Sequence, residues 1–158
     1  MCPYLPVVNM AVGETTCDGK KKTWEILADM VPMYVMEVPQ KKERIDRQLW
    51  LKEVRLFRDK MEELSGTKIT LNALKRGVKT INRKRQALAK LHDFRKESVL
   101  PISGKDALLV TQVALIDDPK RFARSVEKLN KELEERVKRK IRVFPAKAKR
   151  IMVAGCPM

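Results

Sequence analysis

The chain has 158 residues, of which 44% are hydrophobic, 35% charged and only 5% aromatic. This length suits one ordinary domain, or one small domain with a helical extension, and is too short for two full-sized domains. The composition is typical of a soluble, mostly helical protein. No apolar run approaches the roughly 20 residues needed to cross a bilayer, and the N-terminus lacks the basic flank of a secretory signal. We therefore expect a cytoplasmic protein without a membrane segment.

The formal net charge is +15 at pH 7. Such a charge suits a polyanionic partner, which could be a nucleic acid, a nucleotide-bearing cofactor or an acidic protein. The charge alone does not choose among them. Nucleic acid is disfavoured, because the sequence has no zinc-finger spacing and no ribonucleoprotein motif, and its aromatic residues do not alternate with cations as a stacking surface requires.

The first forty residues predict a strand, a helix and a second strand. Residues 7–13 and 33–38 are short apolar runs, ended by a glycine and a proline, which is typical of buried strands. Between them, Asp18 to Met30 carries apolar side chains on one face of a helix. Two strands joined in this way should be parallel, with a right-handed crossover. The pattern therefore predicts an α/β fold, in the form of a partial Rossmann-like or flavodoxin-like βαβ unit.

From Lys41 onward the pattern changes to amphipathic helices, with apolar residues repeating every three or four positions. The first helix should end at Gly66, and the second should begin after Thr70 as its N-cap. A third should open at Ser103-Gly-Lys-Asp106, which resembles a capping box, and continue to about residue 116. Pro119 should lie in the first turn of a fourth helix.

The last segment predicts another buried strand. Ile151 to Ala154 is apolar, and Gly155-Cys156-Pro157 follows where a helix would be expected to begin. Because a parallel strand without its covering helix leaves apolar surface open to water, we expect the chain to be an interior piece of a longer protein. The alternative is a small complete protein that ends on an edge strand. The predicted organisation is residues 1–40 as the C-terminal part of a first α/β domain, 41–146 as a helical linker, and 147–158 as the first strand of a truncated second α/β domain.

The three cysteines are candidate ligands. Cys2, Cys17 and Cys156 are an odd number in a chain without secretory context, so a disulfide framework is improbable. Cys17 and Cys156 each follow a predicted strand at the carboxyl end, where open α/β sheets bind ligands. Cys17 also begins a helix, whose free amide donors and positive dipole end favour a thiolate. Cys2 precedes Pro3 and could approach Cys17 if the first strand folds back.

Two interpretations of these cysteines stay open on the residues alone. Any single cysteine is more often a buried packing residue than a ligand. As a set, three thiolates without a nearby histidine favour an iron–sulfur cluster over catalytic zinc, since the only histidine, His92, lies in a charged helical segment. Glu14 and Glu37 sit at the ends of predicted strands as possible proton donors, with helix capping or salt bridging as the alternative. Lys20 to Lys22 could hold a phosphate or an acidic partner, or could simply form a solvated helix face.

Several segments resemble a known family in the same order along the chain. They are Cys2-Pro3-Tyr4, GETTCDGKKKTWEIL, the stretch from Tyr34 to Lys42, PISGKDAL and RIMVAGCPM. Together they resemble the 2-hydroxyacyl-CoA dehydratase family, whose 2-hydroxyglutaryl-CoA dehydratase D-components are members. The Gly-Cys-Pro segment is most similar to the double-cubane branch. The resemblance implies an oxygen-sensitive iron–sulfur protein of anaerobic chemistry, with two α/β domains and a 4Fe-4S or fused double-cubane cluster between them. Cys2, Cys17 and Cys156 match the family's thiolate ligands.

The resemblance also implies an activity and partners. An ATP-dependent activator would deliver low-potential electrons for radical dehydration of a 2-hydroxyacyl-CoA, a lyase reaction, or for reduction of small molecules. The full-length protein would be a homodimer or heterodimer. Further cysteines expected for the family are missing from these 158 residues, so we expect a fragment whose site is incomplete. The alternative is a non-catalytic, basic helical module that binds nucleic acid or an acidic protein while its cysteines are inert.

Overall fold

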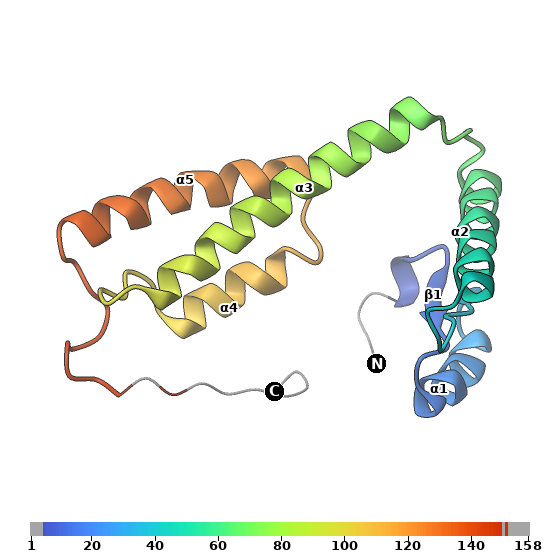
Figure 1. The fold of residues 1–158 in the computed structure, drawn as a ribbon, viewed down its shortest axis with the longest axis horizontal. Coiled ribbons are helices and arrows are strands. Elements are labelled where there is room, and N and C mark those ends of the chain that lie inside the picture. Colours follow the sequence, from blue (N-terminus) through green and yellow to red (C-terminus); the bar gives the residue numbers. More distant parts are fainter. Residues whose placement is uncertain (1–4, 150, 152–158) are drawn as a thin grey trace. The chain divides into compact units, whose positions relative to one another are not determined.

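The computed structural model describes residues 5–149 and residue 151. The chain divides into two compact units between Ile69 and Thr70 (Figure 1). The first contains η1 (Leu5–Val7), β1 (Ala11–Glu14), α1 (Asp18–Ala28), β2 (Met33–Met36) and α2 (Arg44–Ser65), and the second contains α3 (Leu71–Asp93), η2 (Phe94–Lys96), α4 (Gly104–Val113) and α5 (Pro119–Lys138). The predicted division into residues 1–40, 41–146 and 147–158 stays a prediction. Apart from Ile151, the predicted last strand lies outside the described residues.

Strands β1 and β2 form a two-stranded parallel sheet, and α1 connects them. This confirms the predicted βαβ unit and a mixed α/β fold in which helix predominates, while the Rossmann-like or flavodoxin-like topology stays a prediction. The prediction that the first strand begins at residue 7 was wrong, because β1 begins at Ala11. Ala11 pairs with Met33, and its N–H donates to the carbonyl of Pro32 at 2.9 Å. Proline has no N–H with which to continue the ladder toward the N-terminus.

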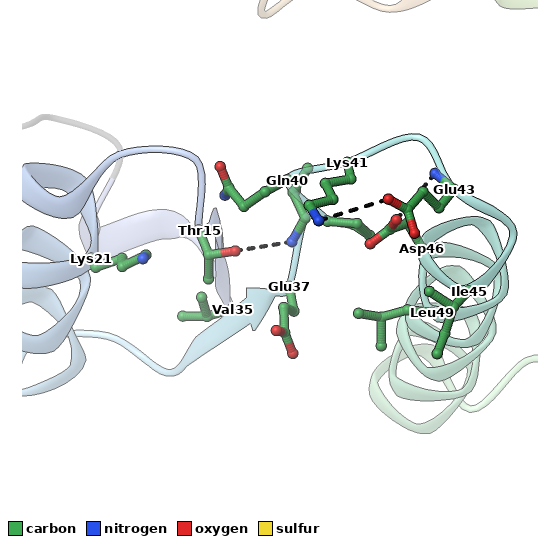
Figure 2. Close-up of a pocket in the computed structure, with 12 residues that line it drawn as sticks. Thr15, Lys21, Val35, Glu37, Gln40, Lys41, Glu43, Ile45, Asp46 and Leu49 are labelled. Atoms are coloured by element: carbon green, nitrogen blue, oxygen red, sulfur yellow. Dashed lines mark hydrogen bonds and ion pairs between the residues drawn. The ribbon is translucent and has the colours of Figure 1, made fainter.

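Helices α1 and α2 cover opposite faces of the sheet. The indole Nε1 of Trp24 in α1 donates to the carbonyl oxygen of Glu14 at 2.9 Å, and its ring occupies the space beside Gly13. On β2, the Tyr34 ring lies 5.5 Å from that of Phe57 in α2, between centroids. Gly13 pairs with the residue that follows Tyr34, and successive strand residues face opposite sides. Figure 2 shows the two helices on either side of β2.

The ends of α2 and α3 follow local capping chemistry. A capping box between Glu43 and Asp46 opens α2, and Gly66 ends it in the left-handed region at φ 63°. A residue with a Cβ is strained in that region, so glycine is the usual choice. The Thr70 hydroxyl oxygen accepts from the N–H of Ala73 at 3.2 Å and caps α3. Both predicted boundaries, at Gly66 and at Thr70, are confirmed.

The second unit is a group of three helices with a continuous apolar core. Helices α3 and α5 run side by side in the same direction, since Arg83 pairs with Glu127 and Lys90 with Glu134. Helix α4, which lies between them in the sequence, runs in the opposite direction along α3 (Figure 1). The core side chains come from all three helices and the segments between them: Ala87, Leu91, Phe94, Ile102, Ala107, Ala114, Phe122, Val126 and Leu133. The predicted helix starts are confirmed, with Ser103 as the N-cap of α4 and Pro119 in the first turn of α5.

None of the helices in the described part of the chain is long and apolar enough to cross a membrane.

Leu133 tests the core of the second unit. It is 0% exposed, whereas Leu108 on α4 is 54% exposed. We expect Leu133→Ala to lower the free energy of unfolding by about 2–5 kcal/mol, because it leaves a cavity as well as losing apolar burial. Leu108→Ala should change it by only about 0.5 kcal/mol. Urea unfolding followed by circular dichroism measures both. Equal effects of the two variants would contradict this core.

A substitution at Gly13 tests how α1 packs on the sheet. A Cβ at Gly13 would lie 2.8 Å from ring atoms of Trp24, whereas one at Gly77 in α3 meets nothing within 4 Å. Gly13→Ala should therefore destabilise the first unit by about 1–3 kcal/mol. The control Gly77→Ala should stabilise α3 by about 0.5–1 kcal/mol. Both tryptophans, Trp24 and Trp50, belong to the first unit, so tryptophan fluorescence during urea unfolding reports the first change, and circular dichroism the second.

Candidate functional site

The candidate site is the turn that joins β1 to α1 at the carboxyl end of the sheet. Cys17 is the N-cap of α1, with extended backbone angles (φ −142°, ψ 130°), and its carbonyl oxygen accepts from the N–H of Lys21 at 3.0 Å. Its side chain is exposed and makes no capping hydrogen bond. The predicted position at a strand-to-helix junction is confirmed. An exposed thiol at a helix N-terminus, beside free amide donors, is available as a soft ligand.

The carboxylate of Glu14 organises this turn. Its Oε2 accepts from the backbone N–H of Thr16 at 2.7 Å, and its Oε1 accepts from Lys20 Nζ at 2.6 Å. The hydrogen bonds from Lys20 and Thr16 lower the pKa of Glu14 to about 2. Glu14 is therefore ionised at neutral pH. Of the two roles considered from the sequence, the structure favours the salt bridge over the proton donor.

The three lysines after Cys17 each have an acidic partner. Lys20 pairs with Glu14 at 2.6 Å, and Lys21 with Asp18 at 3.1 Å. Lys22 pairs with Glu25 on the same helix. The pKa of Lys20 is raised, first by its hydrogen bond with Glu14, then by its charge interaction with Glu14, and to a smaller extent by a charge interaction with Cys17. Lys20 is thus close enough to Cys17 for their charges to interact.

Thr15 ties the turn to the loop after β2. Its hydroxyl oxygen accepts from the backbone N–H of Val38 at 2.9 Å, so the carboxyl ends of both strands are held together. The sequence did not predict that Thr15, Gly13 or Trp24 would take part in this site. The available signal was a threonine directly after a predicted strand, where side-chain hydrogen bonds to the backbone are common.

An open hollow of about 750 Å³ lies at the same edge of the sheet, between β2 and the start of α2 (Figure 2). Its polar lining includes Thr15, Lys21 and Lys41, and its apolar lining includes Val35 and Leu49. Glu37 also lines it, and its backbone N–H donates to Glu53 Oε2 on α2 at 3.3 Å. Cys17 is not part of the lining. The edge therefore offers two separate features, an exposed thiol and a mixed polar and apolar hollow.

Of the three cysteines predicted to bind a cluster, only Cys17 lies within the described residues. Cys2 and Cys156 lie outside the described residues, so the predicted three-cysteine site stays a prediction. Within residues 5–149 and 151, no three His, Cys, Asp or Glu side chains gather as a metal site. His92 lies half-buried on α3, in the other unit. Cys17, a soft and accessible donor, has the chemistry that iron–sulfur clusters require of each ligand.

These features define an α/β protein with a thiol presented at the ligand-binding edge of a parallel sheet. The sequence profile of the family "2-hydroxyglutaryl-CoA dehydratase, D-component" matches residues 1–158. The chain therefore belongs to this family, which confirms the resemblance noted in the sequence. The similarity to the double-cubane branch stays a prediction.

A curated relative agrees with this assignment. The chain is 32% identical over 159 residues to a protein of Escherichia coli (strain K12) named "Putative dehydratase subunit YjiM". The match covers 99% of this chain and 41% of the relative. The chain thus spans less than half of the length of the curated relative that it matches.

The depressed pKa of Glu14 predicts a pH-dependent contribution to stability. Its pKa in the folded state, about 2, lies below the ordinary value of 4.5, so the contribution is present above pH 4.5 and is lost as the pH falls toward 2. Glu14→Gln should therefore destabilise the first unit at pH 7, and the difference from the unsubstituted chain should shrink below pH 4.5. Urea unfolding followed by tryptophan fluorescence at pH 7, 5, 4 and 3 measures this.

Glu25→Gln is the matched control, because it breaks an ion pair within α1, the helix that carries Lys20. Both side chains of this pair, Lys22 and Glu25, are well exposed. Such pairs contribute little to stability. A destabilisation by Glu14→Gln that is the same at every pH would contradict the prediction.

Proposed function

We propose that this chain is part of an iron–sulfur enzyme of the 2-hydroxyacyl-CoA dehydratase family, and that Cys17 supplies one thiolate ligand of its cluster. Cys2 and Cys156 are the other ligands that we propose from this chain. The observation that carries the proposal is a family match over residues 1–158 combined with an exposed thiol at the carboxyl edge of the sheet. Inert packing, the alternative for Cys17, does not suit an exposed side chain.

The residues around Cys17 have supporting roles in this proposal. A bound cluster, either 4Fe-4S or a fused double cubane, would supply single low-potential electrons to a substrate. The N-terminus of α1 presents free N–H groups and the positive end of the helix dipole, which stabilise the negative charge of a thiolate. Glu14 and Thr15 hold the turn through their bonds to Thr16 and Val38. Such surrounding hydrogen bonds orient ligands and tune the group that they hold.

The whole enzyme would work with other proteins. We propose an ATP-dependent activator as the electron donor, a 2-hydroxyacyl-CoA or a small reducible molecule as substrate, and assembly as a homodimer or heterodimer in the cytoplasm. The word "component" in the family description and the word "subunit" in the relative's name support a system of several chains.

A second candidate is a basic helical module that binds a polyanion, and α5 supplies the observation that favours it. All four glutamates of α5 pair with basic residues: Glu127 with Arg83, Glu132 with Arg136, Glu134 with Lys90 and Glu135 with Lys138. Lys120, Arg124 and Lys128 follow one another at helical spacing, are exposed, and have no acidic partner among the described residues. Binding to a polyanion that weakens steeply with salt and is unchanged by Cys17→Ala would favour this candidate.

Anaerobic reconstitution tests the main proposal. The full-length enzyme that contains this chain is incubated with ferrous iron, sulfide and thiol reductant, freed of unbound iron, and examined for iron content, visible absorption and electron spin resonance. We expect cluster absorption in the unsubstituted enzyme and loss of most of it in Cys17→Ala. His92→Ala, which removes the only histidine of these 158 residues, should retain it. An unsubstituted full-length enzyme without cluster absorption, or a Cys17→Ala variant that retains it in full, would overturn the proposal.

A further inference from the structure

The carboxylate of Glu14 is bonded to a residue before Cys17 and to a residue after it. Glu14 contacts the backbone N–H of Thr16 through Oε2 at 2.7 Å, and Lys20 Nζ through Oε1 at 2.6 Å. Thr16 precedes Cys17, and Lys20 follows it by three residues, which is just under one helical turn. Residues three apart lie on the same side of a helix, so the ammonium group is held near the first turn on the side of Cys17.

The backbone that bears Glu14 is itself fixed. Trp24 donates to the Glu14 carbonyl oxygen at 2.9 Å from the space that Gly13 leaves free. On the other side, Thr15 accepts from Val38 at 2.9 Å. Most ion pairs at a protein surface pay side-chain entropy to hold two mobile groups together. Here the acidic partner stands on an anchored strand end, so the position of the ammonium group is better defined.

The neighbouring ion pairs lack this connection. Lys21 pairs with Asp18 and Lys22 with Glu25, each within α1 and three residues apart. Neither reaches the strand or the turn. Among the three consecutive lysines, Lys20 is therefore the one that is bonded to the end of β1.

We propose that Glu14 and Lys20 are positioning residues for Cys17, in which Glu14 fixes the turn that presents the thiol and Lys20 places a positive charge close to its sulfur. This inference rests on the proposed function, in which that sulfur is a cluster ligand. Lys20 lies close enough to Cys17 for their charges to interact, and Glu14 is the acidic partner bonded to Lys20. We therefore expect the loss of the Lys20 charge and the loss of the Glu14 charge to shift the electrostatic potential at the sulfur in opposite directions.

Paired alkylation rates test this without a cluster. The metal-free chain is treated separately with iodoacetate, which is negatively charged, and iodoacetamide, which is neutral, and modification of Cys17 is followed by peptide mass spectrometry apart from Cys2 and Cys156. The rate constant for iodoacetate is divided by that for iodoacetamide. This ratio cancels the thiolate fraction and reports the electrostatic potential at the sulfur. At low ionic strength Lys20→Gln should lower this ratio by about threefold, and Glu14→Gln should raise it by a similar factor. Added salt should reduce both effects.

Lys22→Gln and Glu25→Gln are the matched controls, because they remove the same charges from the same helix without touching the turn. They should change the ratio less than the Lys20 and Glu14 variants do. Shifts of the same sign for Lys20→Gln and Glu14→Gln, or shifts no larger than those of the controls, would overturn the inference. Lys20 is well exposed, so its variant is expected to fold even where the Glu14 variant does not.

The outcome is independent of the proposed function. Loss of cluster absorption in Cys17→Ala tests whether Cys17 is a ligand, whereas the alkylation ratio tests only the charges beside it. A full-length enzyme that binds no cluster, together with opposite shifts for the two variants, would overturn the proposed function and keep the ion-pair geometry.

Discussion

The close approach of Trp24 to Gly13 is the contact on which the first unit depends. A Cβ on Gly13 would lie 2.8 Å from the indole, so the ring can occupy this place only over a glycine. From there the indole N–H reaches the carbonyl of Glu14, the last residue of β1, at 2.9 Å. This one side chain thereby sets both where α1 lies on the sheet and how β1 ends. The turn between them, and Cys17 at the helix N-terminus, take their position from these two constraints.

The two units are stabilised in different ways. Between residues 5 and 69 only Gly13 and Val31 are buried, so the turn that carries Cys17 is held mainly by hydrogen bonds and by the ion pair of Glu14. The second unit has a continuous apolar core around Leu91 and Leu133. In that core Asn130 is also buried, and its Nδ2 donates to the carbonyl of Ala87 at 2.8 Å, which links α5 to α3. Polar contacts are directional, whereas apolar burial is not. The hydrogen bonds and the ion pair of the first unit can therefore hold one side chain, that of Cys17, at a defined place.

Local chemistry was predictable from the sequence, and contacts between distant segments were not. Gly66, Thr70 and Pro119 predicted their helix ends because capping depends on a few adjacent residues. The start of β1 was predicted four residues too early, since it depends on Pro32, the residue before the facing strand β2. Likewise, three consecutive lysines gave no sign of which one would meet Glu14. That choice depends on the angle at which α1 leaves the strand, and Trp24 sets that angle through a contact that spans ten residues. The roles of Cys2 and Cys156 stay predictions.

The net charge of +15 and the setting of Cys17 are separate properties of the chain. Near the thiol, Lys20, Lys21 and Lys22 are each matched by an acidic side chain, so this part of α1 is close to electrically balanced. The uncompensated cations that the structure describes include those of α5, in the other unit, where every glutamate already has a basic partner. The setting of Cys17 is therefore defined by the orientation of nearby groups, namely the amides of the α1 N-terminus and one anchored ammonium group. The basic helices and the cysteine edge can accordingly be tested, and can fail, as independent hypotheses.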